Sequence, residues 1–183
     1  MLNLESEYLP NYGRPHNVQP PPDMSLDYPD PDTPLPVYLH VHPELARRFS
    51  HHQPTTRDLH WSIDWWVSQD LLKTVQSTWE VLPDGSKAQH LTNWGPITRS
   101  PTRAMRMHAK PVLIAIVPLE KRNVLCEIAR TQLVRLPDGE YNCQNFTEEI
   151  LREAVQRGVF EQGDVERALE EAKNGMEKMT YNP

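Results

Sequence analysis

Cysteine is scarce in this chain of 183 residues, which contains only Cys126 and Cys143. Two cysteines cannot form the set of several disulfides that holds many small secreted domains together. The sequence also shows no secretory signal, since no apolar stretch follows a basic segment near its start. No apolar run approaches the ~20 residues of a membrane-spanning helix. We therefore expect no integral membrane segment and a cytoplasmic or nuclear location, with both thiols reduced.

An excess of basic residues is missing as well. The chain has 19 Lys and Arg against 25 Asp and Glu, which gives a formal net charge of −6, and it has no basic run. Proteins that bind nucleic acid or anionic membranes through charge usually carry a basic patch or run. The composition therefore argues against a nucleic-acid partner.

Proline, in contrast, is abundant, and nine of the 18 prolines fall within residues 10–36. This segment has no apolar periodicity, and proline removes backbone hydrogen-bond donors. We predict a disordered proline-rich tail over residues 1–36, a single α+β domain over residues 37–175 and a frayed end over residues 176–183. The tail is either a solvated segment or, over residues 10–36, a polyproline site that recruits a protein partner.

Alternating apolar and polar residues predict strands in the first part of the domain. The clearest strand covers residues 58–67, in which every second residue is apolar and would face the core. The residues between them include His60 and Asp64 and would line a cleft or a covered polar face. Further strands are predicted over residues 37–42, 72–82, 87–94 and 111–117. The last of these is apolar throughout, so we expect a central strand covered on both faces.

Helices dominate the second part. Apolar residues recur at helical spacing after Pro118, after Cys143 and after Asp164, whereas residues 100–109 alternate in a way that is compatible with a further strand. Strands followed by helices, without a repeated strand–helix–strand unit, are typical of an α+β fold. We predict an antiparallel sheet of about four to five strands packed against two to three helices.

A cysteine stands at the start of the second of these helices. The turn Pro137-Asp138-Gly139 would deliver Cys143 to the first helical turn, where amide groups and the helix dipole stabilise a thiolate. His60, on the clearest strand, would be its general base. In the alternative interpretation His60 is a hydrogen-bonded strand residue and Cys143 a small buried hydrophobe, as we also interpret Cys126.

A cysteine–histidine pair also needs a group that orients the base. If the chain turns at Gln69-Asp70, Glu80 comes to lie near His60 on the neighbouring strand. A second turn at Asp84-Gly85 would then bring His90 near Glu80. Either residue is therefore a candidate for the orienting group, although a register shift of one residue would move it to the other face.

The segments around both positions resemble those of a known class of enzymes. His60-Trp61-Ser62-Ile63 resembles the His-aromatic-small-aliphatic strand of the lecithin–retinol acyltransferase-like enzymes. Tyr141-Asn142-Cys143-Gln144-Asn145-Phe146 resembles their Asn-Cys-Glu-His-Phe helix start, and PPPDE-type peptidases carry a similar Asn-Cys. Both groups are circularly permuted, NlpC-type members of the papain-like class, in which the histidine strand precedes the cysteine helix. Some uncharacterised fungal proteins are similar in the same two segments.

The resemblance covers roughly residues 57–160 and departs from the family at Gln144-Asn145, which stand where Glu-His is usual. It implies a papain-like fold with Cys143 as the nucleophile and His60 as the general base. It leaves the orienting residue open between the two candidates above.

Two functions fit these observations. The first is a thiol hydrolase or acyltransferase that acts without a cofactor on an ester, thioester, amide or isopeptide carbonyl of a small molecule, lipid or peptide. The second is a catalytically inactive papain-like module that binds a ligand or peptide and recruits a partner through the proline-rich tail. His40 and His42 have a strand spacing that can chelate zinc, and His51 and His52 follow them, but no cysteine adds a ligand and we predict no metal site.

Overall fold

The computed structural model describes residues 7–42 and 55–179, with side chains up to residue 174. The helical turn that the sequence suggests over residues 43–49, together with His51 and His52, lies outside these residues. The helical elements are η2 (Pro10–Gly13), η3 (Thr56–Asp58), α2 (Arg103–His108), α3 (Leu119–Thr131), α4 (Cys143–Gln156) and α5 (Gln162–Met179). The strands are β1 (Leu35–His42), β2 (His60–Trp66), β3 (Leu72–Val75), β4 (Ser77–Val81), β5 (Lys87–Asn93), β6 (Ile97–Arg99) and β7 (Lys110–Val117).

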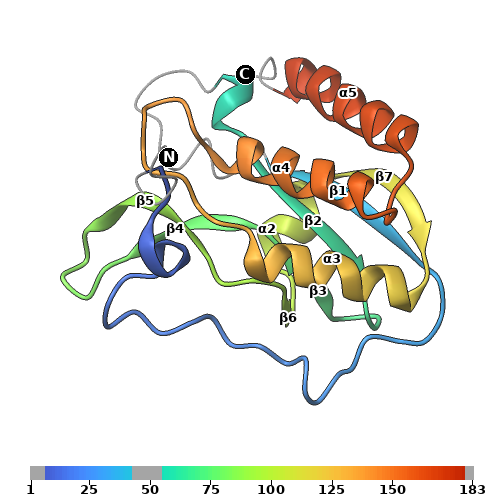
Figure 1. Cartoon of the computed structure of the whole chain (residues 1–183), viewed down its shortest axis with the longest axis horizontal. Helices are drawn as coiled ribbons and strands as arrows, with labels where there is room; N and C mark the ends of the chain where they lie inside the picture. Colours follow the sequence, from blue (N-terminus) through green and yellow to red (C-terminus); the bar gives the residue numbers. More distant parts are fainter. Residues whose placement is uncertain (1–6, 43–54, 180–183) are drawn as a thin grey trace, which may run out of the picture.

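Five of the strands form an antiparallel sheet in the order β6-β3-β2-β1-β7, and β4 and β5 form a separate two-stranded sheet. The three long helices α3, α4 and α5 lie over one face of the larger sheet (Figure 1). The predicted α+β fold, an antiparallel sheet of four to five strands against two to three helices, is confirmed. Helix α5 continues to Met179, past the residue at which we expected the domain to end.

The two faces of the sheet differ in chemistry, as the alternation in residues 58–67 predicts. Under the three helices lie fully buried apolar side chains of β1 and β2, namely Val37, Leu39, Val41, Trp61, Ile63 and Trp65. The opposite face carries polar side chains that are also buried: His40, His60, Ser62 and Asp64. A buried polar side chain needs hydrogen-bond partners, so this second face must be a network rather than a solvated surface.

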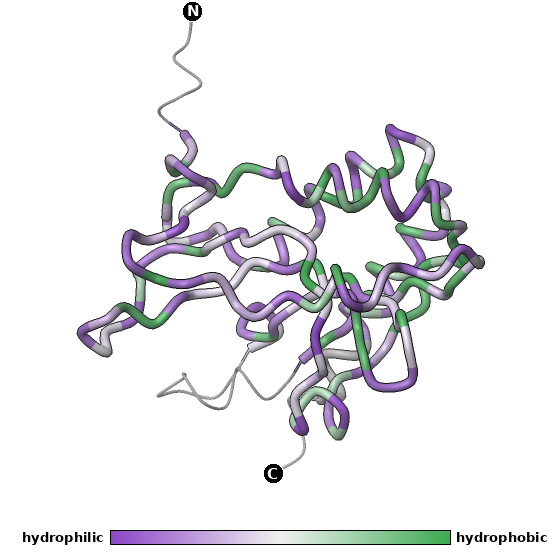
Figure 2. Tube along the Cα trace, turned by 90° about the horizontal axis from the view of Figure 1, so that it is seen from below, coloured by the Kyte–Doolittle hydropathy of each residue, from purple (hydrophilic) through white to green (hydrophobic). Residues whose placement is uncertain are grey.

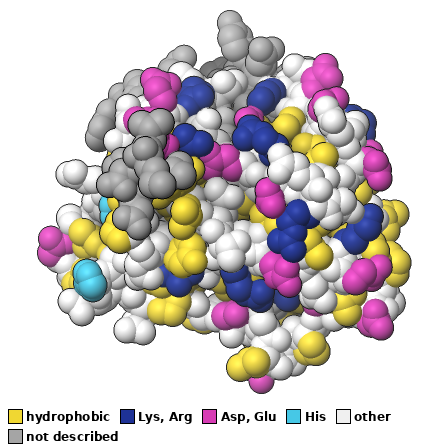
Figure 3. All heavy atoms as spheres, viewed as in Figure 1, with side chains coloured by type: hydrophobic (Ala, Val, Ile, Leu, Met, Phe, Trp, Pro, Cys, Tyr) yellow, Lys and Arg dark blue, Asp and Glu magenta, His cyan; other side chains and the backbone are white. Residues whose placement is uncertain are grey.

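Hydropathy changes sign repeatedly along the helices and strands (Figure 2). Within the described residues no helix is long and apolar enough to cross a membrane. On the face that Figure 3 shows, Lys and Arg side chains are interspersed with Asp and Glu. The outer surface of the helices is therefore charged in both signs, as expected for helices that bury only one side.

Two predicted elements differ from the structure. β7 is an edge strand and not a central one, so that Leu113 is 41 % and Ile116 67 % exposed. The sequence predicts a central strand here because the residues that face outward, such as Leu113 and Ile116, are apolar as well. Arg167 of α5 donates to the carbonyls of Leu113 and Ile114, which blocks part of the free edge. Residues 100–109 contain the short helix α2 instead of a strand, capped by Thr102.

The segment predicted to be a disordered tail is also different over its described part. Residues 7–34 run as an irregular chain packed against the domain, and β1 begins at Leu35. The Leu9 amide donates to the Val134 carbonyl at 2.8 Å and the Met24 amide to the Thr98 carbonyl at 2.8 Å. Proline limits the amide donors of this segment, but its remaining amides, its carbonyls and its acidic side chains all bind the domain.

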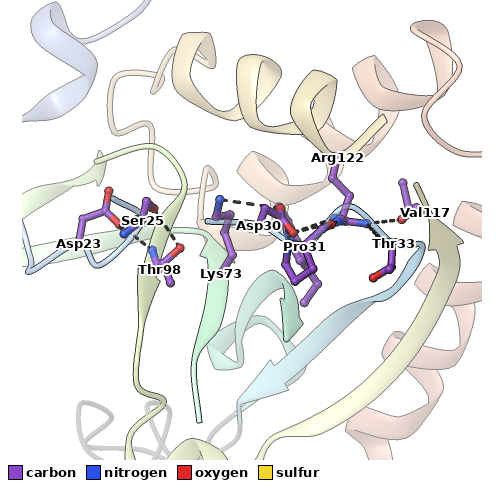
Figure 4. A network of polar contacts seen from close by, with 10 residues as sticks. Asp23, Ser25, Asp30, Pro31, Thr33, Lys73, Thr98, Val117 and Arg122 are labelled. Carbon is purple, nitrogen blue, oxygen red and sulfur yellow. Dashed lines mark hydrogen bonds and ion pairs between the residues drawn. The ribbon is translucent and has the colours of Figure 1, made fainter. Parts of the chain in front are cut away.

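A buried ion pair fastens this segment to the helical layer. Two nitrogens of Arg122 in α3 donate to Oδ1 of Asp30 at 2.8 and 3.1 Å, and Arg122 is fully buried. Further donors of Arg122 bind the carbonyls of Pro31, Thr33 and Val117 (Figure 4). The remaining oxygen of Asp30 accepts from the indole of Trp65 at 2.8 Å. Every group of the pair is thus satisfied, which is the condition under which a buried charge is tolerated.

We predict that Arg122→Met lowers the free energy of unfolding by about 3 kcal/mol, the lower end of the loss for a broken buried pair, because the Asp30 carboxylate keeps only Lys73 Nζ, 3.8 Å away, as a cation. Urea unfolding followed by tryptophan fluorescence measures this loss. The matched control is Lys121→Met, which removes a cation from the exposed neighbouring position of the same helix. Equal stability of the two variants would contradict a structural role for the N-terminal segment.

Candidate active site

The start of α4 is fixed by hydrogen bonds within the loop that precedes it. Oδ1 of Asp138 accepts from the amides of Glu140 and Tyr141, at 2.8 and 2.6 Å. Oδ1 of Asn142, the N-cap, then accepts from the amides of Gln144 and Asn145, at 2.9 and 3.3 Å. Oδ1 of Asn145 in turn accepts from the Asn142 amide at 3.0 Å, which completes a capping box. The helix therefore begins at Cys143, as the sequence predicts.

This helix start docks against an edge of β2 that no described strand occupies. β3 pairs with β2 only over residues 63–66, whereas β1 pairs with it over residues 60–64. At the vacant part of the edge, the Leu59 carbonyl accepts from Nε2 of Gln144 at 2.9 Å and lies 3.8 Å from Sγ of Cys143. Gln144 also donates to the Thr56 carbonyl at 2.7 Å. The turn η3 and Leu59, the residue before β2, are thereby tied to the cysteine helix.

The structure brings Cys143 and His60 together, close enough for each side chain to shift the pKa of the other. The other side of the imidazole is held by Gln76, with Nε2 of His60 2.8 Å from Oε1 of Gln76. A carbonyl oxygen only accepts, so Nε2 carries a proton and Nδ1 is the nitrogen left for the thiol. A thiol, an imidazole and an orienting amide in this order form the arrangement that activates a cysteine nucleophile.

Electrostatics favour the ionised form of this pair. Burial raises the pKa of Cys143, but the charge of His60, its hydrogen bond and the amides of Trp61 and Cys143 together bring the pKa below its usual value. Burial lowers the pKa of His60, yet the Cys143 thiolate and the hydrogen bonds to Cys143 and Gln76 raise it above its usual value. The two shifts describe one state, a thiolate beside an imidazolium.

A second polar network continues from His60 across the same face of the sheet. The rings of His60 and His42 are 5.3 Å apart, and Nε2 of His42 is 2.8 Å from Oγ of Ser62. Ser62 donates to Oδ2 of Asp64, which also accepts from Nδ1 of His40 at 2.9 Å. Burial and the charge of His60 lower the pKa of His42 to about 3, so that ring is neutral.

Within the part of the chain that the structure describes, no group of three or more His, Cys, Asp or Glu has the geometry of a metal site.

His60 and Gln76 open onto a cavity of about 760 Å³ on the polar side of the sheet. The cavity lies between strands β1 to β3 and β6 and the segment of α2. Its described lining includes His42, Thr74, Arg99 and Met105. A volume of this size is in the range of small-molecule sites. Cys143 is 4 % exposed and lies behind His60, next to the backbone of β2.

The two residues that the sequence suggests as orienting groups lie elsewhere. Glu80 accepts from the indole of Trp94 at 2.8 Å and from Thr78 at 3.0 Å, and Nδ1 of His90 is 3.1 Å from the Leu91 carbonyl. The reason is that the predicted strand over residues 72–82 is two strands, β3 and β4, which belong to different sheets. Glu80 in β4 and His90 in β5 belong to the second sheet, and neither side chain contacts His60.

Gln76, which the sequence analysis missed, stands at the point where the strand divides. The observed register sets Ile63 opposite Val75, so a continuous strand would place position 78 opposite His60, with positions 76 and 80 equally distant. The alternation within residues 72–82 places Gln76 on the same face as Glu80. The end of β3 at Val75 decides between them, because Gln76 stays beside His60 while Glu80 belongs to the second sheet.

Gln144 and Asn145, where this chain departs from the resembling enzymes, both have structural roles: Gln144 anchors the turn before β2, and Asn145 completes the cap of α4. Comparison of the chain with models of known protein families, with curated proteins and with solved structures finds no match. The assignment of this site therefore depends on its geometry.

We predict that iodoacetamide alkylates Cys143 at pH 7 at least about 100-fold faster than Cys126. The comparison is matched for access, because each cysteine is 4 % exposed. Burial raises the pKa of Cys126 to about 11, so it is almost entirely a thiol at pH 7. Peptide mass spectrometry over a pH series measures both rates in one sample.

The alkylation rate of Cys143 should rise with pH around a midpoint below about 8.5, the pKa of a free thiol. In His60→Ala this midpoint should rise to about 8.5 or above. His90→Ala, which removes a histidine outside the site, should leave the midpoint unchanged. Similar slow labelling of both cysteines in the unmodified protein would count against a thiolate at Cys143.

Proposed function

We propose that the protein is a cysteine hydrolase or acyltransferase in which Cys143 attacks an ester, thioester or amide carbonyl. The observation that carries this proposal is the series of Cys143, His60 and Gln76, in which the imidazole lies beside the thiol and has its Nε2 fixed by an amide oxygen. The order of the two motifs along the chain, and their similarity to circularly permuted papain-like enzymes, support the same proposal.

The reaction follows from the positions of the protons. Sγ of Cys143 adds to the carbonyl carbon, the tetrahedral intermediate collapses, and the leaving group departs with the proton that His60 provides from Nδ1. A water, alcohol or amine then attacks the thioester as His60 removes its proton, which releases the acid or the transferred acyl group and restores the thiol. The Cys143 amide, in the first helical turn, is the donor best placed to stabilise the oxyanion. Gln76 holds the ring in the tautomer that both steps use.

A non-catalytic binding module is the second candidate, and one observation favours it: Cys143 is 4 % exposed, so its sulfur faces protein. In this case the cavity beside His60 binds a ligand that is not turned over. The recruitment of a partner through residues 10–36 is then limited to the parts that remain accessible, such as Leu26, which is 97 % exposed.

We predict that the protein hydrolyses activated acyl esters, measured by release of 4-nitrophenol, and that Cys143→Ala reduces the rate to that of the buffer. Gln76→Leu, which keeps the size but removes the acceptor, should lower kcat/KM by about 10- to 100-fold, since the base loses its orienting group. Gln76→Glu, which keeps an acceptor oxygen, should restore most of the loss.

The matched controls are Glu80→Gln and His90→Asn, which should leave kcat/KM within about twofold because neither residue touches the site. A full loss in Glu80→Gln with normal folding would return the orienting role to Glu80. Turnover that persists in Cys143→Ala would exclude the proposed nucleophile.

A further inference from the structure

The cavity beside His60 is basic in a protein that is acidic overall. The chain carries a formal charge of −6. Among the described residues that line the cavity, two are arginines, Arg99 and Arg103, three are histidines, and none is Asp or Glu. A cleft lined by one sign of charge concentrates ligands of the opposite sign. The wall of the cavity is therefore suited to an anion although the protein as a whole repels one.

Arg99 is the more buried of the two arginines in this wall, and its guanidinium lacks a partner among the described residues. It ends β6, opposite Leu72 of β3, and is partly buried. Its guanidinium makes no hydrogen bond and no ion pair with any residue that the structure describes, whereas the buried Arg122 uses its donors on one carboxylate and three carbonyls. An arginine stays charged and offers five N–H donors in a planar fork that matches a carboxylate. Unused donors in a half-buried position are a cost that a bound acceptor would remove.

The position of Arg99 relative to the thiol site follows from its neighbours. Its positive charge is close enough to His42 to contribute to the lowered pKa of that ring, and the rings of His42 and His60 are 5.3 Å apart. Asp64 and Glu80 are the acidic groups whose charge reaches Arg99, but Asp64 is bound to His40 and Ser62, and Glu80 to Trp94 and Thr78. Neither carboxylate therefore forms a hydrogen bond or ion pair with the Arg99 guanidinium.

The α2 wall of the same cavity is more apolar. Ala104, Met105 and Met107 of α2 line it, beside Arg103 and His108. Unbranched Met side chains adapt to apolar ligands of varied shape. A ligand that fills the cavity thus meets the partly buried Arg99 on the sheet side and, on the helix side, an apolar surface with the exposed Arg103 beside it.

We propose that Arg99 is a specificity-determining residue that binds a carboxylate at the far end of the substrate, so that the enzyme prefers acyl groups with an anionic terminus and an apolar chain. The proposal builds on the proposed function of Cys143 and His60. It requires that the carboxylate lies at Arg99 when the reacting carbonyl lies at the thiol, with the chain along the α2 side of the cavity.

The kinetic test compares the 4-nitrophenyl monoesters of adipic, suberic and sebacic acid with their methyl-capped counterparts, which have the same chain without the charge. At the best chain length the charged ester should have a kcat/KM at least about 10-fold above that of the capped ester, the size expected for one charge-assisted contact. Arg99→Met should remove this preference by slowing the charged ester and should leave the capped ester within twofold. Arg106→Met, which removes a cation on α2 that does not line the cavity, is the matched control and should keep the preference.

A binding test separates this proposal from the catalytic one. Calorimetry on the Cys143→Ala variant should show octanoate binding at least about 10-fold tighter than octanamide, and Arg99→Met in the same background should abolish the difference. If neither ester is turned over but octanoate still binds through Arg99, the proposed catalysis fails and the anion site stands. Turnover of the capped esters without any preference for charge, or an equal loss for both esters in Arg99→Met, would overturn the role of Arg99.

Discussion

The first residues of β2 have a strand on one side only, and the site depends on what fills the other side. β3 stops pairing with β2 at Ile63, and the next strand belongs to a second sheet. The start of α4 occupies the vacant edge, where the Leu59 carbonyl binds Gln144 and contacts Cys143. The strand that turns away leaves Gln76 at the branch point, within reach of His60. One divergence in the sheet thus places Cys143, His60 and Gln76 together.

The buried polar face of the sheet gives this arrangement its electrostatic character. Burial favours neutral groups, and His42 obeys this rule. His60 does not, because the Cys143 thiolate and its hydrogen bonds outweigh burial. The carboxylate of Asp64 remains ionised through its bonds to His40 and Ser62. Negative charge therefore sits at both ends of the network, and the imidazolium at His60 is the cation that the thiolate requires.

Part of this arrangement can be predicted from sequence. The start of a helix at Cys143 and the alternation around His60 are local patterns, and both appear in the structure where the sequence predicts them. The alternation over residues 72–82 does not reveal that the strand divides, because both halves keep the same period. The sequence therefore points to Glu80 or His90 as the orienting residue rather than to Gln76. Register and sheet membership depend on long-range pairing, which a single sequence specifies weakly.

The packing of the N-terminal segment and of β7 could not be predicted from the sequence either. The proline content within residues 10–36 excludes regular structure but not packing, and the Asp30–Arg122 pair has no local signal, since the two residues are distant in the chain. The apolar run of β7 predicts burial on both faces, yet strand order alone makes it an edge. Composition sets which residues can be buried, and topology sets which of them are.

The protonation state of the His60 ring at pH 7, measured by ¹⁵N NMR of the imidazole nitrogens, tests the thiolate–imidazolium pair most directly. We predict an imidazolium, with both nitrogens protonated and a pKa above the ordinary value of about 6.5. In Cys143→Ala the raising influence of the thiolate is lost, so the pKa should fall and the ring should become neutral at pH 7, with the remaining proton on Nε2 facing Gln76. A neutral ring in the unmodified protein, or a pKa that does not change when Cys143 is replaced, would contradict the thiolate–imidazolium pair.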